Sequence, residues 1–202
     1  MTNATGGVPT GNTFDKYAAA NPVERRMMQG FFGALDGFVR AAAPSRVVEV
    51  GAGEGEVATR VRELCPDAAI SLLDLPDPEL MAHWAPAGHS GTAGLAEALP
   101  FPDDCADLVL AIEVLEHVED PRAALAEIAR IASGHVVVSV PREPIWRIGN
   151  MVRLRYLGDL GNTPGHIQHW SARSFAALVG EFFDVVEVRT PLPWTMVHAR
   201  VR

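Results

Sequence analysis

Hydrophobic residues follow two spacings along the chain, one typical of helices and one typical of strands. Helical spacing dominates from residue 21 to 42. The apolar positions that share one face there are Val23, Met27, Phe31, Ala34, Leu35 and Phe38. The pattern predicts an N-terminal helix, with Asn21 as its cap and Pro22 in its first turn.

Short apolar runs, each typical of a buried strand, recur after this helix. They occupy residues 46–50, 68–74, 106–113 and 135–141. Helical patterns at 57–64 and 121–132 separate some of them, and Asp120 and Pro121 supply a cap and a first-turn proline for the second helix. Strands that alternate with helices in this way predict a parallel sheet with helices on both faces.

The last two strand-like runs differ from the earlier ones because no helix separates them. They occupy residues 182–191 and 194–202 and are joined through Pro191 and Pro193. A connection this short is too small for a crossover between parallel strands. The two runs are therefore expected to form an antiparallel pair.

The stretch from residue 142 to 170 interrupts the alternation. It combines an amphipathic helical pattern over residues 145–156 with a turn-rich sequence, GDLGNTPGHIQHW. Ser171 then fits a helix N-cap, with Trp170 and Phe175 at the spacing of a hydrophobic staple. Because loops at the carboxyl edge of a sheet usually carry substrate choice, residues 142–170 are interpreted as an inserted substrate lid.

Arginines gather in this insertion although the chain is acidic. They are Arg142, Arg147, Arg153 and Arg155. They could bind an anionic substrate, or lie on a membrane surface together with Trp146 and Leu157, so that residues 142–160 make a peripheral membrane contact. The alternative interpretation is that they only solvate one face of a lid helix.

Length and composition fit one globular domain. The chain has 202 residues, and the domain is expected over residues 14–202, after a flexible tail at residues 1–13. The net charge of −8 opposes nucleic-acid binding, which depends on basic patches, so a small-molecule partner is expected. Cys65 and Cys105 match no metal or redox spacing, and no apolar run approaches a membrane span. A cytoplasmic protein is expected, and no oligomeric state is predicted.

A glycine-rich turn joins the first strand to its helix. Gly51, Gly53 and Gly55 let the backbone take positive φ and approach a ligand closely, while the N–H groups of a helix start favour an anion. Asp74 closes the next strand, where an acidic group can accept hydrogen bonds from ribose hydroxyls. The third glycine comes one residue earlier than in the dinucleotide fingerprint G-x-G-x-x-G, which disfavours an NAD-dependent oxidoreductase but keeps it as an alternative.

The motifs, taken in order, resemble those of class I S-adenosylmethionine-dependent methyltransferases, in particular the methyltransferase type 11 and ubiquinone-pathway O-methyltransferase groups. The matching sequence segments are EVGAGEG, Asp74, GLAEALPFPDDCADLVL, and EVLEHVEDPRAALAEIARI followed by VVVSVP. The resemblance runs from about residue 46 to the C-terminus. It implies a Rossmann-like, doubly wound α/β fold whose seven-stranded sheet is mostly parallel, with its last strand antiparallel and helices on both faces.

The resemblance also implies S-adenosylmethionine as the cofactor and a set of residues that hold it. The glycine turn would bind the methionine part, Asp74 the ribose, and the turn at Ala96 the adenine. Residues 14–43 would form a helical cover segment over the cofactor. The cofactor-binding residues implied in this way are Tyr17, Glu49, Gly51, Ala52, Gly53, Gly55, Asp74, Leu75, Ala96, Glu97 and Glu113.

A second group of titratable residues follows the fourth strand of that fold. Glu113, Glu116 and His117 have i, i+3 and i+4 spacing, which aims all three the same way if the chain turns helically there. The resemblance to small-RNA 3′-terminal 2′-O-methyltransferases implies that these three and His166 hold Mg²⁺, or another divalent metal such as manganese or zinc. Two alternatives are that His117 or His166 acts as a general base without metal, and that the group only caps the following helix.

The function expected from this sequence is therefore methyl transfer from S-adenosylmethionine to a small-molecule acceptor. A hydroxyl oxygen is the favoured acceptor atom, in secondary metabolism or quinone biosynthesis. The alternatives are a metal-dependent RNA 2′-O-methyltransferase, an NAD-dependent oxidoreductase, and a catalytically silent partner subunit.

Overall fold

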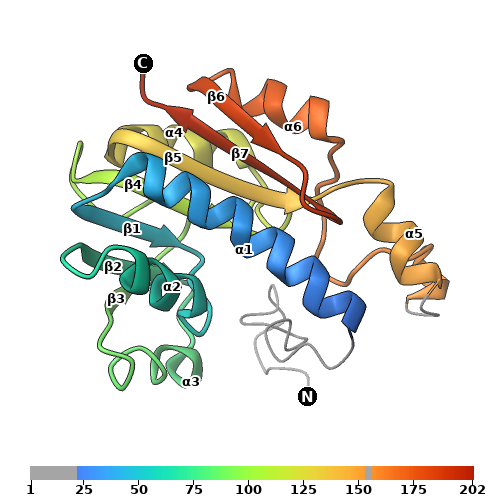
Figure 1. The fold of residues 1–202 in the computed structure, drawn as a ribbon, viewed down its shortest axis with the longest axis horizontal. Helices are drawn as coiled ribbons and strands as arrows, with labels where there is room; N and C mark the ends of the chain where they lie inside the picture. Colours follow the sequence, from blue (N-terminus) through green and yellow to red (C-terminus); the bar gives the residue numbers. More distant parts are fainter. Residues whose placement is uncertain (1–21, 153–155) are drawn as a thin grey trace.

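A seven-stranded sheet forms the centre of the protein, in the strand order β3-β2-β1-β4-β5-β7-β6 (Figure 1). The structure is a computed structural model and describes residues 22–152 and 156–202. Strands β1 to β5 pair in parallel, whereas β7 pairs antiparallel with both β5 and β6. The fold class expected from the sequence, including the antiparallel end of the sheet, is confirmed.

The strands are β1 (Arg46–Val50), β2 (Ala69–Asp74), β3 (Ser90–Ala93), β4 (Ala106–Ile112), β5 (Ala132–Pro141), β6 (Asp184–Arg189) and β7 (Trp194–Arg200). The helices are α1 (Pro22–Ala42), α2 (Glu56–Leu64), α3 (Pro78–Met81), α4 (Pro121–Ile131), α5 (Ile145–Val152) and α6 (Ala172–Val179), with a short 3-10 helix at Leu157–Asp159. The sequence pattern predicted neither α3 nor β3.

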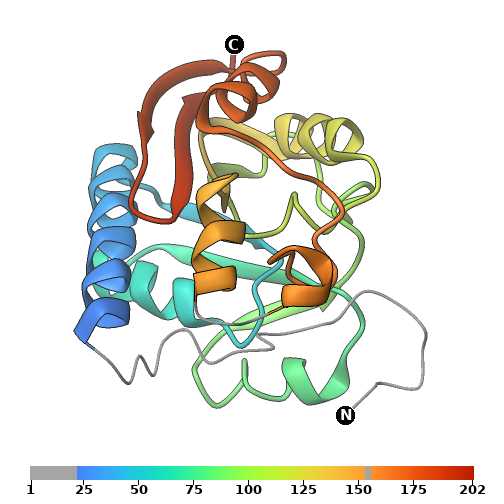
Figure 2. The same cartoon turned by 90° about the vertical axis from the view of Figure 1, so that its right-hand side faces the viewer.

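Helices cover both faces of the sheet and divide the core into two layers. Figure 2 shows α1, in blue, on one side of the sheet and α4, in yellow, on the other. On the α1 and α2 side, Phe38 and Val61 pack against the sheet, and on the α4 and α6 side Ile128 and Phe175 do so. Because the middle strands are buried on both faces, their residues are almost all apolar, as the sequence pattern indicated.

Local signals set several of the helix starts. The side chain of Asp120 accepts hydrogen bonds from the N–H groups of Arg122 and Ala123, as expected for the cap of α4. Ser171 caps α6 in a capping box with Ser174, and the rings of Trp170 and Phe175 lie 5.6 Å apart. The predicted N-caps of α4 and α6 and the staple are confirmed, whereas the third predicted cap, Asn21, lies outside the described residues.

The inserted segment folds back onto itself. Arg142 and Trp170, at its two ends, form a parallel bridge, and the N–H of Glu143 donates to the carbonyl of Trp170. The segment therefore leaves the sheet after β5 and returns to the same place before α6. In Figure 1, α5 lies beyond the arrowhead of β5.

Some sequence expectations fall on residues that the structure does not describe. These are the tail at residues 1–13, Tyr17 and Asn21 with the first part of the cover segment, and Arg153 and Arg155 of the inserted segment. Within the described residues, no helix has both the length and the apolar character needed to cross a membrane.

A histidine pair, of which His198 is buried, links β5 to β7 and predicts a pH-dependent stability. The Nδ1 of His135 and the Nε2 of His198 are 2.7 Å apart, and burial, followed by the charge of His135, lowers the pKa of His198 to about 4. The unfolded chain therefore binds more protons than the native chain below an ordinary histidine pKa of about 6.5. The free energy of unfolding is expected to fall by about 2 kcal/mol between pH 7.5 and pH 5 through this group.

Urea unfolding at both pH values, with His198→Gln as the reference, measures this dependence. The substitution removes the titrating group, so the variant should lose less stability on acidification than the natural chain. An equal loss in the two proteins would show that His198 does not titrate between the folded and unfolded states.

Candidate functional site

The sequence-predicted site residues come together at the carboxyl edge of the sheet. Val50, the last residue of β1, pairs with Leu73 of β2 on one side and with Ala111 of β4 on the other. The glycine turn after β1, Asp74 at the end of β2 and the acidic turn after β4 are therefore neighbours. This edge is where open α/β sheets bind their ligands.

The glycine turn is held by hydrogen bonds from its own backbone. The N–H groups of Gly51 and Ala52 both donate to the carbonyl of Leu73, at 2.7 and 3.0 Å. The N–H of Gly53 donates to Oδ2 of Asp74 at 2.7 Å, and the indole N–H of Trp84 donates to the carbonyl of Gly53 at 2.8 Å. The turn is thus shaped before any ligand binds, and Asp74 is part of its frame.

The buried carboxyl group of Glu49 lies at the start of α2. Glu49 is 2 % exposed, and its Oε2 has no hydrogen-bond partner in the described part of the chain. Burial and then the charge of Asp74 raise the pKa of Glu49 well above its ordinary value, while a hydrogen bond from the Ala58 N–H acts in the opposite direction. The carboxyl group of Glu49 thus accepts one N–H of the helix start where the sequence predicts an anion, and binding of a ligand anion there stays a prediction.

Asp74, the predicted ribose ligand, has two acidic neighbours. Burial raises the pKa of Asp74, and the charges of Glu54 and Asp77 raise it further, whereas the N–H groups of Gly53 and Leu75 lower it. A cationic ligand would relieve this repulsion, and a polyanionic ligand would increase it.

Positive φ is required at all three turn glycines, but only Gly51 is also crowded. Gly51, Gly53 and Gly55 have φ of 72°, 54° and 85°. A Cβ at Gly51 would meet the side chain of Val114, whereas a Cβ at Gly53 would have no heavy atom within 4 Å. This close approach at Gly51 brings the glycine turn against the turn that follows β4.

The pair Gly51→Ala and Gly53→Ala separates backbone strain from crowding. Both substitutions place an L-residue at positive φ, which costs about 1–2 kcal/mol, but only Gly51→Ala also displaces Val114. Gly51→Ala is expected to lower the unfolding free energy by about 2 kcal/mol more than Gly53→Ala. Equal losses in chemical denaturation would contradict the close approach of the two turns.

The turn after β3 carries Ala96 and Glu97, for which the resemblance implies contacts with the adenine. The N–H of Gly94 donates to the carbonyl of Asp74, and the N–H of Ala98 donates to that of Leu95. Ala96 and Glu97 lie between them, at the tip of this turn, and Ala96 is buried. The structure thus places these two residues near the strand end that carries Asp74, and their contact with the adenine stays a prediction.

The chain does not turn helically after β4, so the expected common direction of the three titratable residues is wrong. Glu113 has a positive φ of 61°, and a single reverse turn follows, closed by the His117 N–H and the carbonyl of Val114. The side chain of Glu113 accepts hydrogen bonds from Ser139 Oγ at 3.1 Å and from the indole N–H of Trp194 at 2.7 Å. Its carboxylate therefore lies toward β5 and β7.

Glu116, His117 and His166 form the group that could hold a metal ion. Each offers one ligand atom, and these atoms all lie within 4.8 Å of one another. The rings of His117 and His166 have centroids 4.9 Å apart, at an angle of 79°. Of the four ligands implied by the resemblance, the structure brings these three together, while Glu113 is not in the group.

The tautomer of His117 is fixed by the lid. Its Nδ1 lies 2.9 Å from the carbonyl oxygen of Gly165, which can only accept a hydrogen bond, so Nδ1 carries the proton when the ring is neutral. The lone pair of Nε2 is then directed away from this contact. The Nε2 atom lies 4.0 Å from Oε1 of Glu116. A neutral His117 can therefore coordinate a cation or accept a proton through Nε2.

The lid is anchored directly to this turn. The N–H groups of Ile167 and Gln168 both donate to the carbonyl of Glu116, at 2.9 and 3.1 Å. The position of His166 is consequently fixed by backbone hydrogen bonds from the two residues that follow it to the turn after β4. His169, the other histidine of this segment, lies at the surface, and its Nε2 donates to Asn162 Oδ1 at 2.8 Å.

Two tryptophans connect the inserted segment to the sheet, a role that the sequence did not indicate. The Trp146 ring packs against the rings of His166 and Trp194, with centroids 5.9 Å apart in both pairs. Trp194 in turn packs against Phe31 of α1 at 5.0 Å and donates to Glu113. The only sequence signal was apolar character, since nothing in the local pattern distinguishes an indole that donates to a carboxylate from one that only packs.

Comparisons with known proteins relate this chain to methyltransferases. Residues 48–138 match the family model described as a methyltransferase domain. The chain is 32% identical over 124 residues to a malonyl-[acyl-carrier protein] O-methyltransferase of Geobacter sulfurreducens, a match that covers 58% of this chain and 44% of that protein. It is 34% identical over 122 residues to a demethylmenaquinone methyltransferase of Roseiflexus castenholzii, covering 55% of this chain and 51% of the relative.

A solved structure extends the likeness over most of the fold. The magnesium protoporphyrin IX methyltransferase of Synechocystis, determined with bound SAH, has a TM-score of 0.66 and 15% sequence identity, and the match covers 91% of this chain and 89% of that one. This likeness concerns the fold alone. The curated relatives are matched over about half of their own length.

Proposed function

We propose that this chain transfers the methyl group of S-adenosylmethionine to a small-molecule acceptor. The match of residues 48–138 to a methyltransferase-domain model and the methyltransferase names of the curated relatives support this proposal. The choice of S-adenosylmethionine as cofactor rests on the acidic residues Glu49 and Asp74 beside the glycine turn. Glu49 lies at the start of α2 and Asp74 beside it. S-adenosylmethionine carries a sulfonium and an ammonium group, which suit these carboxyls, whereas the diphosphate of NAD would be repelled.

In this proposal, three segments at the carboxyl edge bind different parts of the cofactor. The segment Glu49 to Gly55 binds the methionine part, Asp74 with Leu75 binds the ribose, and Ala96 and Glu97 bind the adenine. Methyl transfer is an in-line displacement, so the protein's main contribution is to hold the acceptor's lone pair aligned with the sulfonium methyl. Tyr17, which lies outside the described residues, stays a prediction for the cofactor carboxylate.

The acceptor is proposed to be a hydroxyl group of a small molecule. The two curated relatives are named for O-methylation of a malonyl-carrier and for methylation of demethylmenaquinone. The second name supports quinone biosynthesis, whereas secondary metabolism stays a prediction from the sequence. RNA is the second candidate acceptor, because His117 and His166 lie together as in the resemblance to RNA 2′-O-methyltransferases, but the net charge of −8 opposes it.

A divalent metal at Glu116, His117 and His166 is proposed as a second component of the site. The ligand atoms lie close enough for one ion, and the hydrogen bond from His117 to Gly165 directs Nε2 as a ligand requires. Without Glu113 the donor set is two imidazoles and one carboxylate, which suits manganese or zinc better than magnesium. When bound, such an ion would act as a Lewis acid on the acceptor hydroxyl.

His117 and His166 are the proposed catalytic residues in either case. If no ion binds, the lone pair of His117 Nε2 can accept the hydroxyl proton directly, because its Nδ1 is committed to Gly165. His166 is 8 % exposed and packs edge-on against His117, so it fixes the position of that ring.

Incubation with S-adenosylmethionine and a panel of acceptors, followed by mass spectrometry, tests the proposed function. The panel contains a demethylquinone, a malonyl-carrier protein, plant and polyketide phenols, and a small-RNA duplex. A gain of one methyl group on a small hydroxyl compound is expected. Methylation of RNA alone would replace the first candidate acceptor by the second, and reduction or oxidation of a substrate with NAD in place of methylation would contradict the proposal.

A further inference from the structure

We propose that Arg130 and Glu127 of α4 are positioning residues for the adenosine end of the cofactor site. They do not lie at the carboxyl edge themselves. They act by fixing the connection from Gly94 to Asp104, whose tip carries Ala96 and Glu97. This inference rests on the proposed function, because it assigns these residues to the binding of S-adenosylmethionine.

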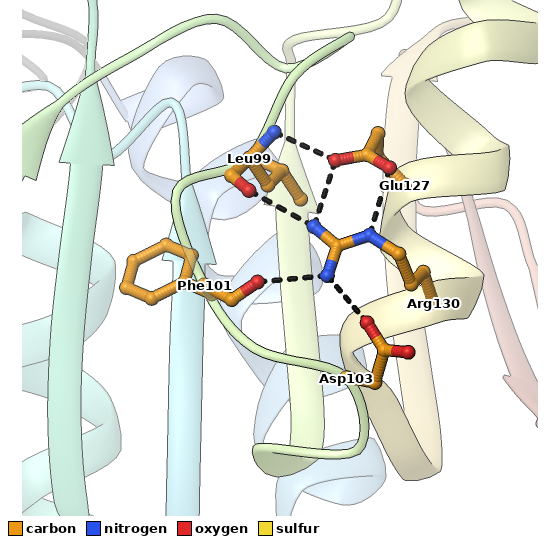
Figure 3. Close-up of polar contacts among 5 residues, drawn as sticks. All are labelled: Leu99, Phe101, Asp103, Glu127 and Arg130. Atoms are coloured by element: carbon orange, nitrogen blue, oxygen red, sulfur yellow. Dashed lines mark hydrogen bonds and ion pairs between the residues drawn. The ribbon is translucent and has the colours of Figure 1, made fainter.

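Arg130 makes five hydrogen bonds through its guanidinium group (Figure 3). Its Nη1 donates to the carbonyl of Phe101 and to Oδ1 of Asp103, both at 2.8 Å. Its Nη2 donates to the carbonyl of Leu99 at 2.9 Å. The remaining bonds, from Nε and Nη2, go to the two carboxylate oxygens of Glu127. One side chain thus holds three residues of the connection.

Glu127 completes the attachment by accepting from the backbone as well. Its Oε2 accepts a hydrogen bond from the N–H of Leu99 at 2.8 Å. The N–H and the carbonyl of Leu99 are therefore both bound by Glu127 and Arg130. The N–H of Asp104 donates to the main-chain carbonyl of Arg130 at 3.1 Å. A lysine in place of Arg130 could not reproduce the planar, multiply bonded arrangement.

The fixed point at Leu99 lies next to the proposed adenine contacts. At the other end of the turn, the Gly94 N–H is bonded to the carbonyl of Asp74, which carries the ribose-binding carboxylate. A Cβ at Gly94 would lie 2.9 Å from the Leu73 side chain and 3.2 Å from Pro100, so the chain is closely packed there. Ala96 and Glu97 therefore span two anchors, and the Arg130–Glu127 pair provides one of them.

A pair on the same helix offers a matched control. Arg122 makes a two-fold hydrogen bond to Glu181 at 2.8 and 2.7 Å, but this contact is exposed and joins α4 to the segment after α6. Arg122→Lys therefore makes the same chemical change as Arg130→Lys without touching the Gly94 to Asp104 connection.

Calorimetric titration of the folded variants with S-adenosylmethionine and with methylthioadenosine, which lacks the amino-acid part, tests the inference. Arg130→Lys and Glu127→Gln are expected to raise the Kd for both ligands by a similar factor of about ten, whereas Arg122→Lys should stay within about twofold of the natural chain. The similar factor for the two ligands is the signature of a defect at the adenosine end.

The outcomes separate this inference from the proposed function. If the natural chain binds S-adenosylmethionine and the Arg130→Lys and Glu127→Gln variants bind it equally well, with only a lower melting temperature, the pair is merely structural and the inference is overturned. A loss for S-adenosylmethionine without a loss for methylthioadenosine also overturns it. Failure of the natural chain to bind either ligand contradicts the proposed function instead.

Discussion

Asp74→Ala is expected to weaken S-adenosylmethionine binding by roughly 100-fold, or about 2.7 kcal/mol. Two effects combine in this loss. In the proposed complex the carboxylate accepts the ribose hydroxyls, and in the free protein it already accepts the N–H groups of Gly53 and Leu75, at 2.7 Å each. Its removal therefore deletes ligand contacts and releases the glycine turn. Titration calorimetry measures the change in affinity directly.

Two further variants identify which effect dominates. Asp74→Asn keeps one acceptor oxygen and should recover part of the affinity. Glu79→Gln removes a carboxylate charge from the exposed face of α3, so its affinity should stay near that of the natural chain. If Glu79→Gln weakens binding as much as Asp74→Ala does, then net charge, and not the position of Asp74, governs the affinity, and the assignment of Asp74 fails.

Glu116→Gln and His166→Ala are expected to weaken divalent-metal binding by at least roughly 100-fold, because loss of a direct ligand should exceed the ten- to 100-fold effect of an outer contact. Both residues belong to the group whose ligand atoms lie within 4.8 Å of one another. Titration of the protein with Mg²⁺, Mn²⁺ and Zn²⁺ measures this, with manganese also followed by electron paramagnetic resonance. Manganese or zinc is expected to bind more tightly than magnesium.

Glu113→Gln is the control that distinguishes the structure from the sequence-based hypothesis. Because the Glu113 side chain accepts from Ser139 and Trp194, its substitution should leave metal affinity within about threefold of the natural value. Loss of the metal in Glu113→Gln equal to that in Glu116→Gln would restore the four-ligand site implied by the resemblance. Absence of metal binding by the natural chain would leave His117 as a general base without an ion.

The sequence predicted most of the fold because the middle strands are buried on both faces. Such strands need continuous apolar runs, and those runs are visible without the structure. By contrast, β3 consists of Ser90–Ala93, whose residues are all exposed, and α3 is a single turn. Neither element has enough buried apolar residues to produce a periodic pattern, so only pairing with β2 and packing around Leu80 identify them.

The site was predictable where it depends on local sequence and not where it depends on distant contacts. The glycines, Asp74 and the turn at Ala96 follow from the order of motifs along the chain. The direction of Glu113 depends on Ser139 and Trp194, which are 26 and 81 residues away in sequence. From the sequence alone, Arg130 is likewise expected to be a solvated helix residue. Its hydrogen bonds to the connection between β3 and β4 are visible only in the structure.

Titration calorimetry of the natural chain with S-adenosylmethionine and, separately, with NAD tests the central claim most directly. The acidic turn at Glu49 and Asp74 predicts saturable one-to-one binding of S-adenosylmethionine and no measurable binding of NAD at the same concentrations. Binding of NAD without binding of S-adenosylmethionine would contradict the account and favour the oxidoreductase alternative.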